Sequence, residues 1–92
     1  MELEREVESR LCTQVAARGG LCLKWGVDGW PDRIVICPVS GKTVYAELKR
    51  RTGRASQLQR YRHAQLRRCR ADVRLLFTAE EVDAFVRELF GE

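Results

Sequence analysis

The sequence predicts a mixed α/β domain, an α+β arrangement in which helices pack against a sheet that contains a hairpin. Three observations predict this class. Apolar residues recur at three-to-four spacing near both ends of the chain, they alternate or cluster in short runs between, and glycine-containing turns separate these runs. The 92 residues suffice for one domain and are too few for two, so residues 1–92 are expected to form a single domain.

Residues 2–31 are expected to form one helix, one strand and a loop. Residues 2–18 predict an amphipathic helix that ends at Gly19-Gly20, because glycine commonly terminates helices. Its apolar positions are Leu3, Val7, Leu11 and Val15, with Cys12 beside them. Residues 21–25, "LCLKW", alternate in the way a strand does, and residues 26–31, "GVDGWP", carry turn residues typical of a loop.

Two further strands are expected to form a hairpin. "RIVICP" and "TVYAELK" are joined by the short connection "VSGK", which favours antiparallel pairing. If the turn is centred near residues 39–41, residues whose numbers add up to about 80 face each other. This arithmetic brings Asp32 opposite the end of the strand that carries Glu47 and Lys49, give or take a residue.

The second half predicts a helix, a strand and a last helix. Ser56 opens the first of these helices with Gln59 in the capping-box position, and its expected apolar side holds Leu58, Tyr61, Leu66 and Cys69. "DVRLLF" at 72–77 is a branched, buried-looking strand, parallel to a neighbour because the chain reaches it through a helical crossover. Thr78 and Glu81 form a second capping box. The last helix has a wide apolar face made of Val82, Phe85, Val86, Leu89 and Phe90.

Charge is strongly segregated along the chain. Between Lys49 and Arg70 lie nine lysines or arginines and no acid, whereas the remainder holds eight basic and thirteen acidic residues. A basic block on an otherwise acidic protein indicates a polyanionic partner, most simply nucleic acid. The alternative is a solvated arginine surface that keeps a small domain soluble.

Cysteine usage and hydropathy suggest a cytoplasmic protein. Cys12, Cys22, Cys37 and Cys69 form no CxxC pair, so we expect reduced, mostly buried thiols and neither structural zinc nor a disulfide scaffold. No apolar run reaches the roughly 20 residues that a membrane span needs, and the acidic N-terminus does not resemble a signal peptide. We therefore expect no membrane partner.

The end of the hairpin gathers two carboxylates and an amine. Glu47 and Lys49 are two residues apart on a strand, so their side chains leave on the same face, where Asp32 is expected. Two close carboxylates favour a cation between them, and Mg²⁺ or Mn²⁺ takes such oxygen ligands and can activate water at a phosphodiester. Alternatively, Glu47 and Lys49 face solvent and Asp32 simply follows Pro31 in a turn.

Pro31-Asp32 followed by Glu47-Leu48-Lys49 resembles the motif of PD-(D/E)xK nucleases, and the stretches "GGLCLKW", "GWPDR", "AELKR" and "SQLQRYRH" resemble the VRR-NUC family, in its small stand-alone phage-type form. The resemblance covers roughly residues 4–77. It implies a restriction-endonuclease-like αβββαβ core with an extra C-terminal helix. It also suggests a bacterial or phage-infected host cell as the location.

The resemblance also implies a role for each matching residue. Asp32, Glu47 and the Leu48 carbonyl would be metal ligands, and Lys49 would be the catalytic lysine. The first helix would add Glu8, with Glu4 as the alternative one turn earlier, although an ordinary surface acid is the competing interpretation of Glu8. The family's glutamine near the site falls on Gln59, whose capping position explains it equally well. One departure is that Arg70-Ala71 stands where the family usually has a glycine.

A basic stripe is expected beside this site. A helical wheel for residues 56–70 places Arg60, His63, Arg67 and Arg70 on one side, and Arg50, Arg51 and Arg54 extend that side toward the hairpin. Such a stripe suits phosphate contacts without base readout. His63 is the single histidine, and it fits a polar surface residue equally well.

Three functions compete on these observations. The first is a metal-dependent DNA endonuclease that cuts branched DNA such as a Holliday junction as a homodimer, since the resemblance implies paired sites. Trp25, Trp30 or the last helix would form the dimer interface, unless they belong to the core. The second is a non-catalytic nucleic-acid-binding protein that uses only residues 49–70. The third is a protein-interaction module that uses Phe85 and Phe90.

Overall fold

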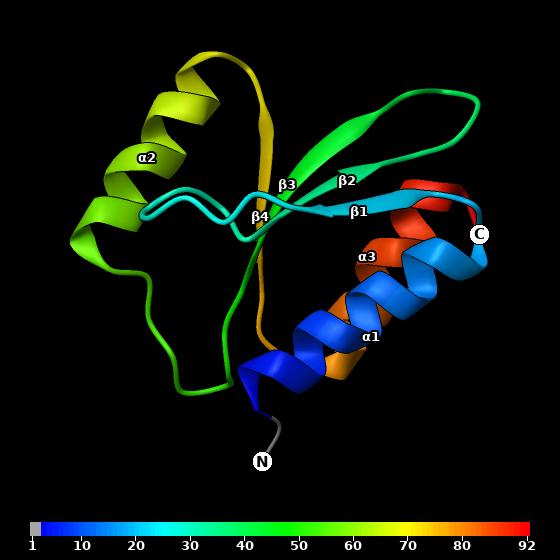
Figure 1. The fold of residues 1–92 in the computed structure, drawn as a ribbon, viewed down its shortest axis with the longest axis horizontal. Coiled ribbons are helices and arrows are strands. Elements are labelled where there is room, and N and C mark those ends of the chain that lie inside the picture. The colour runs from blue at the N-terminus through cyan, green and yellow to red at the C-terminus, as the bar shows by residue number, and fades with distance from the viewer. Residues whose placement is uncertain (1–2) are drawn as a thin grey trace.

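A computed structural model describes residues 3–92, which form three helices and one four-stranded sheet (Figure 1). The elements in chain order are α1 (Glu4–Ala17), β1 (Leu21–Lys24), β2 (Arg33–Ile36), β3 (Thr43–Leu48), α2 (Gln57–Arg68), β4 (Asp72–Leu76) and α3 (Ala79–Phe90). The predicted order is confirmed. The predicted start of the first helix at residue 2 lies outside the described residues.

The sheet has the strand order β1-β2-β3-β4, with antiparallel pairing across the first three strands and parallel pairing between β3 and β4. Arg33 pairs with Ala46 and Ile36 with Thr43, so the hairpin register lies one residue from the predicted one and within the stated tolerance. The next residues outward are Asp32 and Glu47. The hairpin and the parallel crossover were therefore both predicted correctly.

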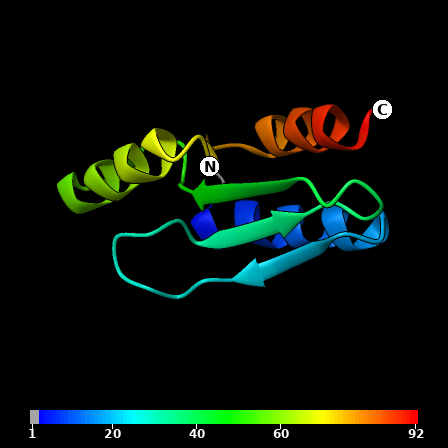
Figure 2. The same cartoon turned by 90° about the horizontal axis from the view of Figure 1, so that it is seen from above.

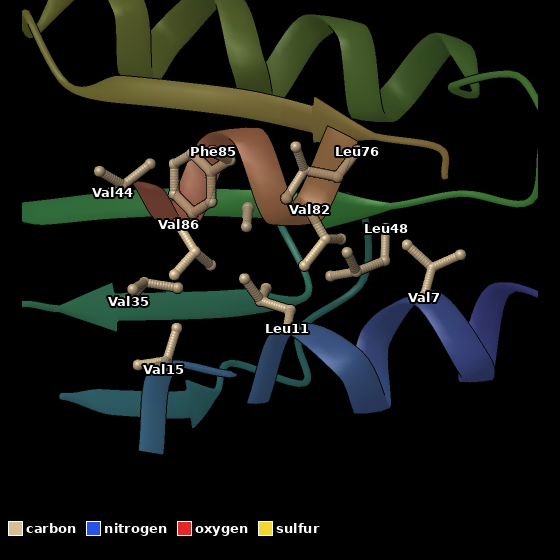
Figure 3. Packing of buried hydrophobic residues seen from close by; sticks show 11 residues of the cluster. Val7, Leu11, Val15, Val35, Val44, Leu48, Leu76, Val82, Phe85 and Val86 are labelled. Carbon is tan, nitrogen blue, oxygen red and sulfur yellow. The ribbon is translucent and has the colours of Figure 1, made fainter. Parts of the chain in front are cut away.

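The hydrophobic core lies on one face of the sheet, beneath α1 and α3. Figure 1 shows these two helices side by side and α2 apart from them, and Figure 2 shows the same separation from above. On β3 the residues that face this core are Val44, Ala46 and Leu48, all fully buried. The helices contribute Val7, Leu11, Val15, Val82, Phe85 and Val86 (Figure 3). The apolar side of the last helix is therefore part of the protein's own core.

Helix α2 packs against β4 and, unlike α1 and α3, contributes no residue to the hydrophobic core cluster. Its expected apolar side is wrong, because Leu58 and Tyr61 are about half exposed and Cys69 is exposed. The residue of α2 that is buried is His63. The end of the sheet beneath α2 carries the buried Glu47 of β3, so the helix offers polar side chains to it instead of apolar ones.

Two further expectations are settled by the backbone and the exposure of the thiols. Of the cysteines only Cys37 is buried, whereas Cys12 and Cys22 are half-buried and Cys69 is exposed, so the expectation of mostly buried thiols is wrong. Arg70 has a φ of 63°, the left-handed conformation that glycine adopts without cost. The turn before β4 is thus retained although the chain lacks the expected glycine. Within residues 3–92, no helix is long and apolar enough to cross a membrane.

Candidate active site

The hairpin brings Asp32 beside Glu47. Asp32 directly precedes β2, and its carboxylate Oδ2 accepts a hydrogen bond of 2.9 Å from the backbone N–H of Leu48. This bond ties the loop that precedes β2 to the end of β3. The convergence that the sequence predicted is therefore present in the structure.

Glu47 lies on the face of the sheet opposite the core. Because Ala46 and Leu48 point into the core, the side chain of Glu47 between them points toward α2. It is 1% exposed. Gln59 of α2 donates from Nε2 to Glu47 Oε2 at 3.2 Å, and the Lys49 Nζ lies 3.7 Å from the same oxygen. The other oxygen, Oε1, is buried and has no hydrogen-bond partner.

Gln59 serves two purposes at once. Its side-chain Oε1 accepts from the backbone N–H of Ser56 at 2.8 Å, while its own backbone N–H donates to the Ser56 hydroxyl at 3.1 Å. These bonds form the capping box that begins α2. The amide nitrogen of the same side chain reaches Glu47, so the cap and the contact with the site coexist.

His63 is a site neighbour that the sequence prediction placed wrongly. It is 2% exposed rather than part of the exposed stripe, and its Nε2 lies 3.5 Å from Glu47 Oε1. Burial, followed by the charges of Arg67 and Lys49, lowers the pKa of His63, which favours the neutral ring. The signal was available in the sequence, because residues four apart on a helix share a face and Gln59 already pointed at the site.

The electrostatics of the pair suit a cation. Burial, and next the adjacent Asp32 carboxyl, raise the pKa of Glu47 to about 8, while Lys49 acts in the opposite direction. A divalent ion would supply the charge that this pair lacks and a partner for the free Glu47 Oε1. Within residues 3–92, no three histidine, cysteine or acidic side chains converge on one point. Two carboxylates nevertheless fit Mg²⁺ or Mn²⁺, because such an ion is commonly bound by one or two carboxylates and keeps several of its own hydration waters.

The two glutamates of α1 take different positions near the site. Glu8 lines a cavity of about 250 Å³ together with Asp32 and Gln59, and its Oε2 accepts a hydrogen bond of 2.7 Å from the Arg33 Nε. Glu4 lies close enough to Glu47 for its charge to raise the pKa of that residue. Both acids therefore remain candidates for the helix ligand.

The loop between β1 and β2 forms a wall of this cavity, a role that the sequence analysis did not assign to it. The ring of Trp30 stacks on Trp25 at 5.1 Å between centroids, and the Arg62 guanidinium lies 4.8 Å from the Trp30 ring centroid. Gly29 is buried against the side chain of Leu58. The loop that ends in Asp32 is thus fastened to α2, and the two tryptophans are engaged within the chain.

The predicted phosphate-binding arginines lie on exposed surface. Arg50, Arg51 and Arg54 are exposed in the connection from β3 to α2, as is Arg60 on α2. Arg67 is also exposed, although its Nη2 donates to the Val73 carbonyl at 3.0 Å. Apart from His63, the predicted basic stripe therefore lies on the protein surface.

Comparison with solved structures finds a similar fold. A structure described as a "VRR_NUC domain" matches this chain with a TM-score of 0.79 and 27% sequence identity, over 91% of this chain and 94% of that one. A scan of family models and a search of curated proteins give no match. The match in fold extends over nearly the full length of both chains. The chain accordingly resembles a VRR_NUC domain in fold over nearly its whole length.

Proposed function

We propose that this chain is a divalent-metal-dependent endodeoxyribonuclease that hydrolyses phosphodiester bonds in branched DNA. The likeness to a VRR_NUC domain supports a nuclease of the PD-(D/E)xK type. The observation that carries the finer proposal is the buried Glu47, whose Oε1 has no hydrogen-bond partner and which lies beside Asp32 and Lys49. A buried carboxylate with an unused oxygen and a second acid next to it is costly without a cation.

Each residue of the site has a proposed role. Asp32 and Glu47 would hold Mg²⁺ or Mn²⁺, with the Leu48 carbonyl beside them and Glu8, or Glu4, from α1. The chemistry supplied by the ion is polarisation of the phosphodiester and activation of water for in-line attack. Two of the chain's own groups assist. The Lys49 ammonium offsets negative charge that develops on the phosphate, and Gln59 holds the Glu47 carboxylate in place.

DNA would approach along the exposed arginines. Arg50, Arg51 and Arg54 lead to the site, and Arg60 and Arg67 continue the basic surface on α2. These side chains suit phosphate contacts and offer no base-reading element, which favours recognition of DNA structure. One site per chain cuts one strand, so a homodimer would cut the two strands of a four-way junction.

A cleavage assay tests the proposal. A labelled four-way junction is incubated with Mg²⁺, with Mn²⁺ and with chelator, using wild type, Asp32→Asn and Lys49→Ala. Wild type should cut with either ion and not with chelator, and both variants should lose at least about a hundredfold in rate. The controls Glu80→Gln and Lys42→Ala change exposed charges outside the cavity that Asp32 lines and should retain the rate. Undiminished cleavage by Asp32→Asn would contradict the assignment of Asp32 as a metal ligand.

The helix ligand is decided in the same assay. Glu8→Gln and Glu4→Gln are compared with Glu6→Gln, a control on another face of α1. A loss of rate confined to one of the first two variants, relieved by raised metal concentration, identifies the ligand. If neither variant differs from the control, α1 supplies no ligand.

A non-catalytic nucleic-acid-binding protein is the second candidate, favoured by the nine basic residues without an acid between Lys49 and Arg70. It requires salt-sensitive binding that chelator does not alter, and no cleavage with any divalent ion. Fluorescence anisotropy at several salt concentrations measures the binding. The interaction module expected from Phe85 and Phe90 is disfavoured, because Phe85 is 4% exposed and Phe90 packs on the core.

A further inference from the structure

Two cysteines outside the pair of carboxylates formed by Asp32 and Glu47 lie in contact. Cys12 on α1 and Cys22 on β1 have their Sγ atoms 3.0 Å apart. A disulfide bond is about 2.05 Å long, so the two sulfurs need to approach by only about 1 Å to bond. The tight turn at Gly19 and Gly20 between α1 and β1 brings the two elements into this contact.

We propose that Cys12 and Cys22 form a reversible disulfide that fastens helix α1 to the edge strand β1. The proposal concerns a covalent modification site and does not depend on the proposed nuclease activity. The thiols are each half-buried, so a small oxidant can reach them while they remain shielded from other protein molecules. The other thiols differ, because Cys37 is buried and Cys69 is exposed.

The expected chemistry is thiol–disulfide exchange with a small disulfide such as oxidised glutathione. The Cys12 thiolate attacks one sulfur of the reagent, which forms a mixed disulfide and releases one glutathione thiolate. The Cys22 thiol then loses its proton to solvent and attacks the Cys12 sulfur, which forms the protein disulfide and releases the second glutathione. The protein loses two protons and two electrons, and the reagent is reduced to two glutathione molecules.

The order of these steps follows from the environment of Cys22. Burial, together with the adjacent Cys12, raises the pKa of Cys22 to about 12. Cys22 is therefore the poorer first nucleophile. Once Cys12 is held in a mixed disulfide, its charge no longer opposes the ionisation of Cys22, and the neighbouring sulfur is within reach.

The bond would secure an exposed part of the fold that adjoins the site. Strand β1 lies at the sheet edge and is the least buried strand. The Cys22 carbonyl accepts from Arg33 Nη1 at 3.2 Å, and Arg33 also pairs with Glu8. Glu8 lies one helical turn before Cys12, so the disulfide would fix the segment of α1 that carries Glu8 to the strand that supports Arg33.

The experiment oxidises the full chain with oxidised glutathione and compares it with reduced protein. A Cys37→Ser/Cys69→Ser variant retains only the proposed pair. It should lose both thiols together, lose the mass of two hydrogen atoms, carry no glutathione, and melt on the order of 10 °C higher. Adding Cys12→Ser should abolish the rise in Tm. Peptide mapping of oxidised wild type gives the same answer if the variant folds poorly.

The outcomes separate clearly. A Cys12–Cys22 peptide, reversed by a reducing thiol and accompanied by a higher Tm, supports the proposal. A stable glutathione adduct on either cysteine of the pair, two persistently free thiols, or an oxidised form that melts no higher overturns it.

Discussion

Replacing Gly29 with alanine should disturb both the fold and the candidate site. The same replacement at Gly26 serves as the reference for the size of the effect. Gly29 has a φ of 81°, and a Cβ there would meet Leu58 Cγ at 2.5 Å and Cδ2 at 2.7 Å. Gly26, in the same loop, has a φ of 67°, and a Cβ there would meet nothing within 4 Å. Each alanine carries the left-handed penalty of about 1 kcal/mol, but only Gly29→Ala adds overpacking.

We expect Gly26→Ala to lower the free energy of unfolding by about 1 kcal/mol and Gly29→Ala by about 2 to 4 kcal/mol. Urea denaturation measures both, with equal m-values as the check that the unfolded states are comparable. Cleavage should fall further in Gly29→Ala, because Asp32 lies three residues downstream on the same loop. Adding Leu58→Ala should restore part of the loss. Equal destabilisation by the two alanines would refute the claim that this loop is positioned by its contact with α2.

Glu47→Gln should change how stability depends on pH. With a folded-state pKa of about 8 against an ordinary 4.5, the folded state holds a proton that the unfolded state has lost, so the contribution of Glu47 to the stability of the metal-free wild type should fall by about 2 to 3 kcal/mol between about pH 5.5 and 7.5. The lowered pKa of His63 opposes part of this fall in both proteins, because it favours the folded state as the pH rises. Denaturant unfolding measured at several pH values should show that the free energy of unfolding depends less on pH in Glu47→Gln than in wild type. Equal pH dependence in the two proteins would contradict the raised pKa of a buried Glu47. Arg70→Gly should raise the free energy of unfolding by about 0.5 to 1 kcal/mol, since glycine relieves the positive φ, whereas the exposed control Arg68→Gly should lower it. Ser56→Ala should cost about 1 kcal/mol and also lower cleavage, because Gln59 loses one of its anchors; a loss of stability with unchanged cleavage would show that Gln59 does not depend on its cap.

The sequence predicted what depends on local periodicity. The hairpin placed Asp32 beside Glu47 because strand pairing and alternation are regular, and the caps at Ser56 and Thr78 are short-range patterns that the structure retains. The predicted capping box at Thr78 is wrong in one half, because the Glu81 side chain accepts from the backbone N–H of Phe77. The face of α2 was mispredicted because the site lies beneath that helix. A helix normally turns apolar residues inward, but here the inward residues serve a buried carboxylate, so His63 replaces the expected Leu58 and Tyr61.

Contacts between different elements of the fold could not be predicted from the periodicity of the sequence. The pairing of Glu8 with Arg33 depends on how α1 is rotated over the sheet, and no spacing in the sequence specifies that rotation. The approach of Cys12 to Cys22 has the same origin. Both required the tertiary arrangement of α1 and the edge of the sheet.

The pairing of β2 with β3 restricts which changes in chain length the protein can accept. Insertion of one residue within either strand would reverse the facing of every residue beyond it, so that Ala46 would point toward α2 and Glu47 into the apolar core. The turn at Pro38–Lys42 is different, because it is exposed and Val39 already adopts a positive φ there. Added residues can accumulate in that turn without disturbing the pairing of Arg33 with Ala46. Among functional homologues, the turn should therefore vary in length. The number of residues from Arg33 to the turn should change only together with an equal change in the number from the turn to Glu47.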